Sequence, residues 1–75
     1  MDVVFYGRLA ELTGCTTLHP EDVTDTDQLK QKLFGLYPAI ANIPFAIAVN
    51  NQIVQGNSSI LINDTVALLP PFSGG

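Results

Sequence analysis

One segment of this chain has the length and apolar spacing of a substantial helix, and short β-prone runs lie on both sides of it. The segment covers residues 26–37. Three leucines recur there at the i, i+4 and i+7 spacing of a single helix face: Leu29, Leu33 and Leu36. Asp25 and Gln28 have the spacing of a capping box at its start, and Pro38 cannot continue a helix. A 75-residue chain with one such helix is restricted to small single-domain folds in which the helix covers a sheet.

The runs on either side of the helix predict strands separated by turns. Runs rich in β-branched and aromatic residues predict strands at about residues 2–6, 15–18, 45–50, 52–54 and 65–69. Asn50-Asn51 tolerates the left-handed backbone that a tight hairpin turn requires. Pro70-Pro71 cannot extend a central strand, so we expect regular structure to stop before it.

The resulting order, ββαβββ, predicts an α+β fold with a mixed sheet and one main helix packed on one face. The ubiquitin-like β-grasp arrangement satisfies this order at this length. In that arrangement the first and last strands lie side by side and parallel in the centre of the sheet, so the chain leaves from its middle. We expect a β-grasp domain over residues 1–69 and a flexible Gly-Gly tail over residues 70–75.

Alternation along the strands assigns side chains to the two faces of this sheet. In the first strand, Tyr6 falls on the face opposite Phe5. If Leu68 faces the helix, Leu69 faces outward by the same argument. Apolar residues on an outer face suit partner docking, because charged residues are depleted in interface cores. The alternative is that such residues fill the core or cover a sheet edge.

Few other residues could carry chemistry. The chain has one cysteine, Cys15, and one histidine, His19, so we expect neither an intrachain disulfide nor a Cys/His metal site. Cys15 is expected to behave as a small buried hydrophobe and His19 as a surface residue. Four acids near the helix start could bind a cation: Glu21, Asp22, Asp25 and Asp27. A capped helix start accounts for most of this cluster, so no metal site is predicted.

Charge and hydropathy argue against two classes of partner. Seven acidic and three basic residues give a net charge of −4, which phosphate would repel, so nucleic acid binding is not expected. Acidity of this kind favours a basic protein partner, or serves solubility alone. The first residues lack a basic and apolar leader, and no apolar run approaches the roughly 20 residues of a membrane span. We therefore expect a cytoplasmic protein without a signal peptide or a membrane segment.

The C-terminal tail is the remaining candidate for chemistry. Gly74 and Gly75 have no side chains, so this end could thread a channel that any Cβ would obstruct. The terminal carboxylate becomes a good acyl donor when joined to AMP, and transfer of sulfide to it would give a thiocarboxylate. Such a group needs no side-chain chemistry from its carrier. The alternative is an inert, disordered end that finishes in glycines by chance.

Three segments resemble the small subunit of molybdopterin synthase, a sulfur carrier of the MoaD/ThiS family. Residues 66–75, VALLPPFSGG, resemble its C-terminal signature of a hydrophobic strand, Pro-Pro, an apolar residue, Ser or Thr, and Gly-Gly. Residues 5–14 resemble its opening strand and Arg/Leu/Glu/Leu turn, and residues 48–50 its central AVN element. The family usually has Asp-Gly-Asp-Glu before the last strand. Here residues 62–65 read INDT, and we expect Asn63 to take the left-handed role of the glycine.

The resemblance implies a non-catalytic sulfur-donor subunit that binds no cofactor of its own. An E1-like adenylating enzyme would use ATP to convert the Gly75 carboxylate to an acyl-adenylate, which is then loaded with sulfur. The carrier would dock its tail into the large subunit of molybdopterin synthase, in a heterotetramer, and the large subunit would use the sulfur to build the dithiolene on a cyclic pterin phosphate. Gly74 would give clearance in the channel. The implied partner-binding residues are Tyr6, Ile53, Leu69, Pro70, Pro71, Phe72 and Ser73.

Three alternatives stay open at this point. A thiamine-type sulfur carrier shares the fold and the Gly-Gly end, although the Pro-Pro-Phe-Ser spacer argues against it. A ubiquitin-like protein modifier would use the same carboxylate to acylate lysines. A β-grasp interaction module would have an inert tail.

Overall fold

The computed structural model describes residues 1–70, and within them the predicted order of strands and main helix is confirmed. The elements are β1 (Asp2–Phe5), α1 (Arg8–Thr13), β2 (Thr17–Leu18), α2 (Thr26–Leu36), the 3-10 helix η1 (Pro38–Asn42), β3 (Ala46–Val49), β4 (Gln52–Val54) and β5 (Thr65–Leu69). In addition to the predicted elements, α1 forms between β1 and β2, and η1 follows the main helix. Strand β2 is shorter than residues 15–18.

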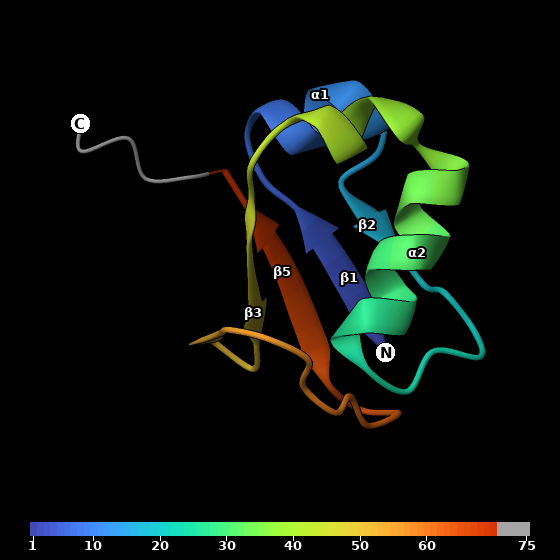
Figure 1. Cartoon of the computed structure of the whole chain (residues 1–75), viewed down its shortest axis with the longest axis vertical. Helices are drawn as coiled ribbons and strands as arrows, with labels where there is room; N and C mark the ends of the chain where they lie inside the picture. The colour runs from blue at the N-terminus through green and yellow to red at the C-terminus, as the bar shows by residue number, and fades with distance from the viewer. Residues whose placement is uncertain (71–75) are drawn as a thin grey trace.

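The sheet has the strand order β2-β1-β5-β3-β4, and α2 packs across one of its faces (Figure 1). Strands β1 and β5 are parallel neighbours, from the pair Asp2 and Thr65 to the pair Phe5 and Leu68. The other neighbouring strands are antiparallel. The prediction of a β-grasp fold with the first and last strands paired at the centre is therefore confirmed.

The core lies between the sheet and the helices. Its side chains come from the inner faces of β1, β3 and β5, from α1, α2 and η1, and from the segment between β4 and β5: Val3, Phe5, Leu9, Leu29, Leu33, Ile40, Ile47, Ile60, Val66 and Leu68. Leu36 was expected to continue the apolar stripe of α2, but it is 54% exposed. The helix ends at this residue, and Ile40 is fully buried in the core that follows it.

The start of α2 is capped as the sequence predicts, with one change of partner. The Asp25 carboxylate accepts a hydrogen bond from the Gln28 N–H at 2.8 Å. Gln28 Oε1 accepts from the Thr24 N–H at 2.9 Å, one residue before the cap, where a capping box would use the N–H of the cap itself. Asn57 adds a bond from outside the helix, because its Oδ1 accepts from the Asp27 N–H. These contacts satisfy N–H groups that a helix start leaves unpaired.

The hairpin turn between β3 and β4 matches the prediction, and the turn before β5 does not. Asn50 and Asn51 have φ of 50° and 71°, as expected. Asn63 is absent from the non-glycine residues with positive φ among residues 1–70, so its expected left-handed role is wrong. The turn is closed by Asp64, whose N–H donates to the Leu61 carbonyl and whose Oδ2 accepts from the Leu61 N–H.

Candidate functional site

The candidate site is the place where the chain leaves the sheet, at the shared carboxyl end of the two central strands. Strand β5 ends at Leu69, and β1 ends beside it at Phe5 (Figure 1). Pro70 is exposed and is the last residue that the structure describes. The predictions for Pro71, Phe72, Ser73, Gly74 and Gly75 lie outside the described residues.

The outer face of the sheet next to this exit is apolar, as the alternation predicts. Leu68 is fully buried under the helices and Leu69, on the opposite face, is half-buried. Tyr6 follows β1 and is 50% exposed. The outward side chains of the central strands, which we call the exit face, are Val4, Tyr6, Ala46, Ala48, Ala67 and Leu69.

Ile53 extends this exit face to the edge of the sheet. It pairs with Ala48, which in turn pairs with Ala67 of β5. Its side chain is 57% exposed. Because β3 separates β4 from β5, and neighbouring strands lie about 4.8 Å apart, Ile53 is about 10 Å or more from the last strand. The structure therefore brings Tyr6 and Leu69 together at the exit, and places Ile53 at the rim of the same face.

The backbone at the exit contains a glycine, Gly7, between β1 and α1. The Tyr6 N–H donates to the Leu68 carbonyl at 3.2 Å, which continues the parallel pairing by one bond. Gly7 then has φ 58° and ψ −132°, close to the first central position of a type II′ turn. The Leu9 N–H closes that turn on the Tyr6 carbonyl at 3.1 Å, and α1 begins. A glycine directly after a strand was the available signal, but its partner across the sheet could not be read from it.

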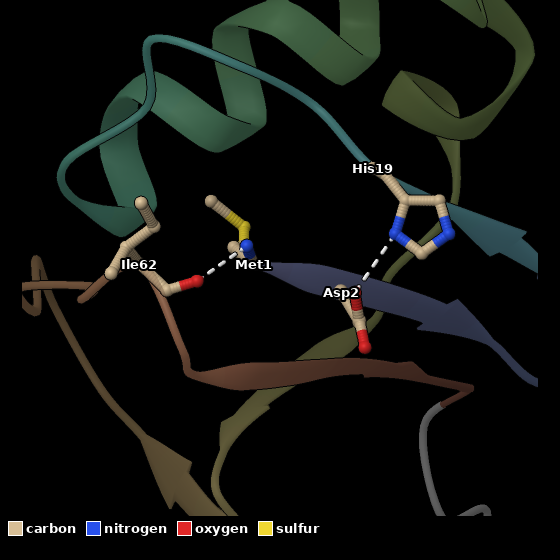
Figure 2. Close-up of polar contacts among 4 residues, drawn as sticks. All are labelled: Met1, Asp2, His19 and Ile62. Atoms are coloured by element: carbon tan, nitrogen blue, oxygen red, sulfur yellow. Dashed lines mark hydrogen bonds and ion pairs between the residues drawn. The ribbon is translucent and has the colours of Figure 1, made fainter.

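Cys15 and His19, the other reactive side chains considered from sequence, make local contacts. The Cys15 thiol is partly buried, with its Sγ 3.6 Å from the Tyr37 hydroxyl. This hydrogen bond raises the pKa of Tyr37, and burial adds to the effect. His19 is exposed, and its Nδ1 lies 2.8 Å from Oδ1 of Asp2 (Figure 2). The His19–Asp2 contact lies at the start of β1, at the opposite end of that strand from the exit.

Of the four acids near α2, Asp25 caps the helix and Asp27 lies in its first turn. Within residues 1–70, no group of three or more His, Cys, Asp or Glu side chains is arranged to hold a metal ion. In the same part of the chain, no helix is long and apolar enough to cross a membrane.

Comparison with known proteins gives the exit a family context. Residues 3–75 match the ThiS family. The molybdopterin synthase sulfur carrier subunit of Dictyostelium discoideum is 29% identical over 80 residues, which cover 97% of this chain and 93% of that protein.

Two solved structures share the fold. SAMP1 from Haloferax volcanii has a TM-score of 0.82 at 23% identity, with 100% of this chain and 98% of that chain covered. A chain in the complex of subunits 1 and 2 of the molybdopterin-converting factor from Helicobacter pylori has a TM-score of 0.70 at 26% identity, with coverage of 99% and 96%. The family match runs through the central strands to Gly75 and agrees with the β-grasp architecture, so this chain belongs to the ThiS family.

Proposed function

We propose that this chain is the sulfur-carrier small subunit of a molybdopterin synthase, with the Gly75 carboxylate as the group that carries sulfur. One observation supports the proposal above the others. The last strand lies at the centre of the sheet and ends beside an exposed apolar face, so the residues after it start next to a docking surface. The family match that extends to Gly75, and the 29% identical Dictyostelium carrier subunit, favour the same function.

The proposed chemistry takes place at the terminal carboxylate. A carboxylate oxygen attacks the α-phosphate of ATP, held by an E1-like adenylating partner, to give an acyl-adenylate and pyrophosphate. Sulfide then attacks the acyl carbon, AMP leaves, and a thiocarboxylate remains on Gly75. In the large subunit the thiocarboxylate transfers sulfur to the cyclic pterin phosphate, and hydrolysis returns the carboxylate. No step needs a side chain of the carrier, so the catalytic groups would belong to the partners.

Docking on those partners is assigned to the exit face. Leu69 and Tyr6 offer apolar area directly beside the point where the chain leaves, and Ile53 would contact the rim of a large partner. Burial of apolar side chains with few charges among them is typical of interface cores. The Helicobacter complex, which joins subunits 1 and 2 of a molybdopterin-converting factor, favours a large-subunit partner for this chain too.

A protein modifier is the second candidate, because SAMP1, a small archaeal modifier protein, has the same fold over the whole chain. The same Gly75 acyl-adenylate would then acylate a lysine. A thiamine-type carrier would be loaded with sulfur in the same way and would differ in its acceptor.

Intact mass spectrometry separates these candidates. The full chain is incubated with its cognate adenylating enzyme, ATP and a sulfur donor, with and without a protein acceptor. A mass gain of one oxygen-to-sulfur exchange identifies a sulfur carrier, and an isopeptide adduct identifies a modifier. Sulfur transfer to cyclic pterin phosphate in the presence of the large subunit then distinguishes the molybdopterin pathway from the thiamine pathway. A chain whose mass never changes would contradict the proposal.

A further inference from the structure

The parallel pairing of β1 with β5 ends before residue 70, and the residues on both strands explain why. In a parallel ladder, a residue donates its N–H to one neighbour across the sheet and accepts at its carbonyl from the residue two positions further along. Tyr6 donates to the Leu68 carbonyl, so the next bond would run from the N–H of residue 70 to the Tyr6 carbonyl. Proline has no N–H, and the ladder therefore cannot continue through Pro70.

The Tyr6 carbonyl is nevertheless satisfied, because the chain turns at Gly7. The turn brings the Leu9 N–H to the Tyr6 carbonyl at 3.1 Å, in place of the bond that Pro70 cannot supply. Its first central residue has φ 58° and ψ −132°, a conformation that side chains strongly disfavour. Gly7 thus ends β1 directly across the sheet from Pro70, which ends β5.

Gly7 and Pro70 also lie close together, so close that Gly7 has little room for a side chain. A Cβ built on Gly7 would lie 3.3 Å from Cγ and 3.9 Å from Cδ of Pro70, and the first of these is closer than ordinary van der Waals contact. Gly14 and Gly56 also have positive φ, of 75° and 72°, but a Cβ on either would meet nothing within 4 Å. Among the glycines of residues 1–70, the restriction on space is therefore specific to Gly7.

We propose that Gly7 is a positioning residue for the tail. Its bare backbone forms the surface on which the Pro70 ring lies, and this contact sets the direction in which the chain leaves the sheet toward a partner. A side chain at this position would displace Pro70 and with it the start of the tail. The inference rests on the proposed function, in which the tail must enter the site of an adenylating enzyme.

The kinetic test uses the full chain as substrate of its cognate adenylating enzyme, with pyrophosphate release as the readout. Gly56→Ala is the matched control, since it places a methyl group at positive φ away from the exit. At a temperature where all variants are folded, we expect Gly7→Ala to raise the KM for the carrier about tenfold over Gly56→Ala with little change in kcat, because a small misplacement of a reacting group is costly. Equal KM values for the two variants would overturn the inference.

A double-mutant cycle with Pro70→Ala separates contact from backbone strain. The backbone strain that a methyl group causes at Gly7 does not depend on the proline ring. The contact between that methyl group and the ring is lost when Pro70 becomes alanine. We expect the KM increase caused by Gly7→Ala to be markedly smaller in the Pro70→Ala background. An increase of the same size in both backgrounds would show that the methyl group acts by strain alone, against the inference.

A measurement on the unsubstituted chain covers the case in which Gly7→Ala does not fold. Nuclear Overhauser effects between the Gly7 Hα protons and the Pro70 Hγ protons are expected in solution, and their absence would overturn the contact. The adenylation assay also includes the chain without Gly75. If the wild type is inactive, the proposed function fails and this role with it. If the wild type is active, the chain without Gly75 is inactive, and Gly7→Ala has the same KM as Gly56→Ala, then only this inference fails.

Discussion

Both ends of the central strand pair β1 and β5 expose apolar side chains, but the backbone pairing ends differently at each. At the starting end Leu61 and Ile62 are 69% and 82% exposed, more than Tyr6 at the exit. There the Met1 amino group donates to the Ile62 carbonyl at 2.6 Å (Figure 2). At the exit, by contrast, Pro70 removes the donor that would continue the sheet. The presence of exposed apolar side chains therefore does not distinguish the two ends. The two ends differ in how the backbone pairing ends.

Asp64 holds the starting end together. Its carboxylate accepts from the Leu61 N–H and from the Asn50 side-chain amide, both at 2.8 Å. Asn50 in turn accepts from the Thr65 N–H, which ties the β3–β4 turn to the first residue of β5. The starting end is thus fixed by polar contacts within the chain, and we assign it a structural role. At the exit, Pro70 offers no N–H to the Tyr6 carbonyl, so the parallel pairing of β1 and β5 ends there.

The largest expected effect that separates the two ends is on partner binding. Leu69→Asp places a charge in the exit face and should weaken binding to the large subunit by about 2 kcal/mol, roughly thirtyfold in Kd. Ile62→Asp is the matched control at the starting end and should bind as the wild type does. Isothermal titration calorimetry with the large subunit measures both. A loss of affinity confined to Ile62→Asp would move the docking surface to the other end.

A second prediction concerns the pH dependence of stability. Hydrogen bonds from the Leu61 N–H and the Asn50 amide hold the pKa of Asp64 below its usual value. A carboxyl whose pKa is lower in the folded state stabilises the fold above the unfolded pKa of about 4, and this contribution is lost as the pH falls through the folded pKa. Asp64→Asn should therefore lower the thermal midpoint at pH 7 and have a smaller effect at pH 2. If thermal scans show the same decrease of the thermal midpoint at pH 7 and at pH 2, the negative charge of Asp64 does not stabilise the fold.

The smallest expected effect is at His19. Its contact with Asp2 is between two exposed side chains, 69% and 57% accessible, and pairs of this kind contribute little. His19→Ala should change the free energy of unfolding by less than about 1 kcal/mol and leave sulfur loading unchanged. Urea unfolding measures the first effect. A larger loss would mean that the starting end depends on this pair as well as on Asp64.

The sequence predicted those features that follow from local periodicity and local backbone preference. Alternation placed Tyr6 and Leu69 outward, and two asparagines predicted the hairpin turn at Asn50-Asn51. The α2 boundaries were close because Asp25 and Pro38 act within one turn of the helix ends. In each case the interaction that decides the structure joins residues near one another in the chain.

The features that were missed depend on individual side-chain contacts and on strand register, which hydrophobic periodicity and backbone preference do not specify. Asn63 was assigned a left-handed backbone because a glycine usually stands in such turns, but Asp64 closes this one with its side chain. Leu36 was predicted to lie in the core, but it is exposed. Ile40 of the next element, η1, is buried in the core instead. The contact between Gly7 and Pro70 depends on the register of β1 and β5, which no local pattern specifies.

The measurement that tests the central claim most directly is sulfur loading of the chain with and without Gly75. Both forms are incubated with the cognate adenylating enzyme, ATP and a sulfur donor, and circular dichroism confirms that both are folded. The account predicts an oxygen-to-sulfur mass gain in the wild type and an unchanged mass in the deletion, because the reacting carboxylate belongs to Gly75. Normal loading of the deletion, or none in the wild type, would contradict it.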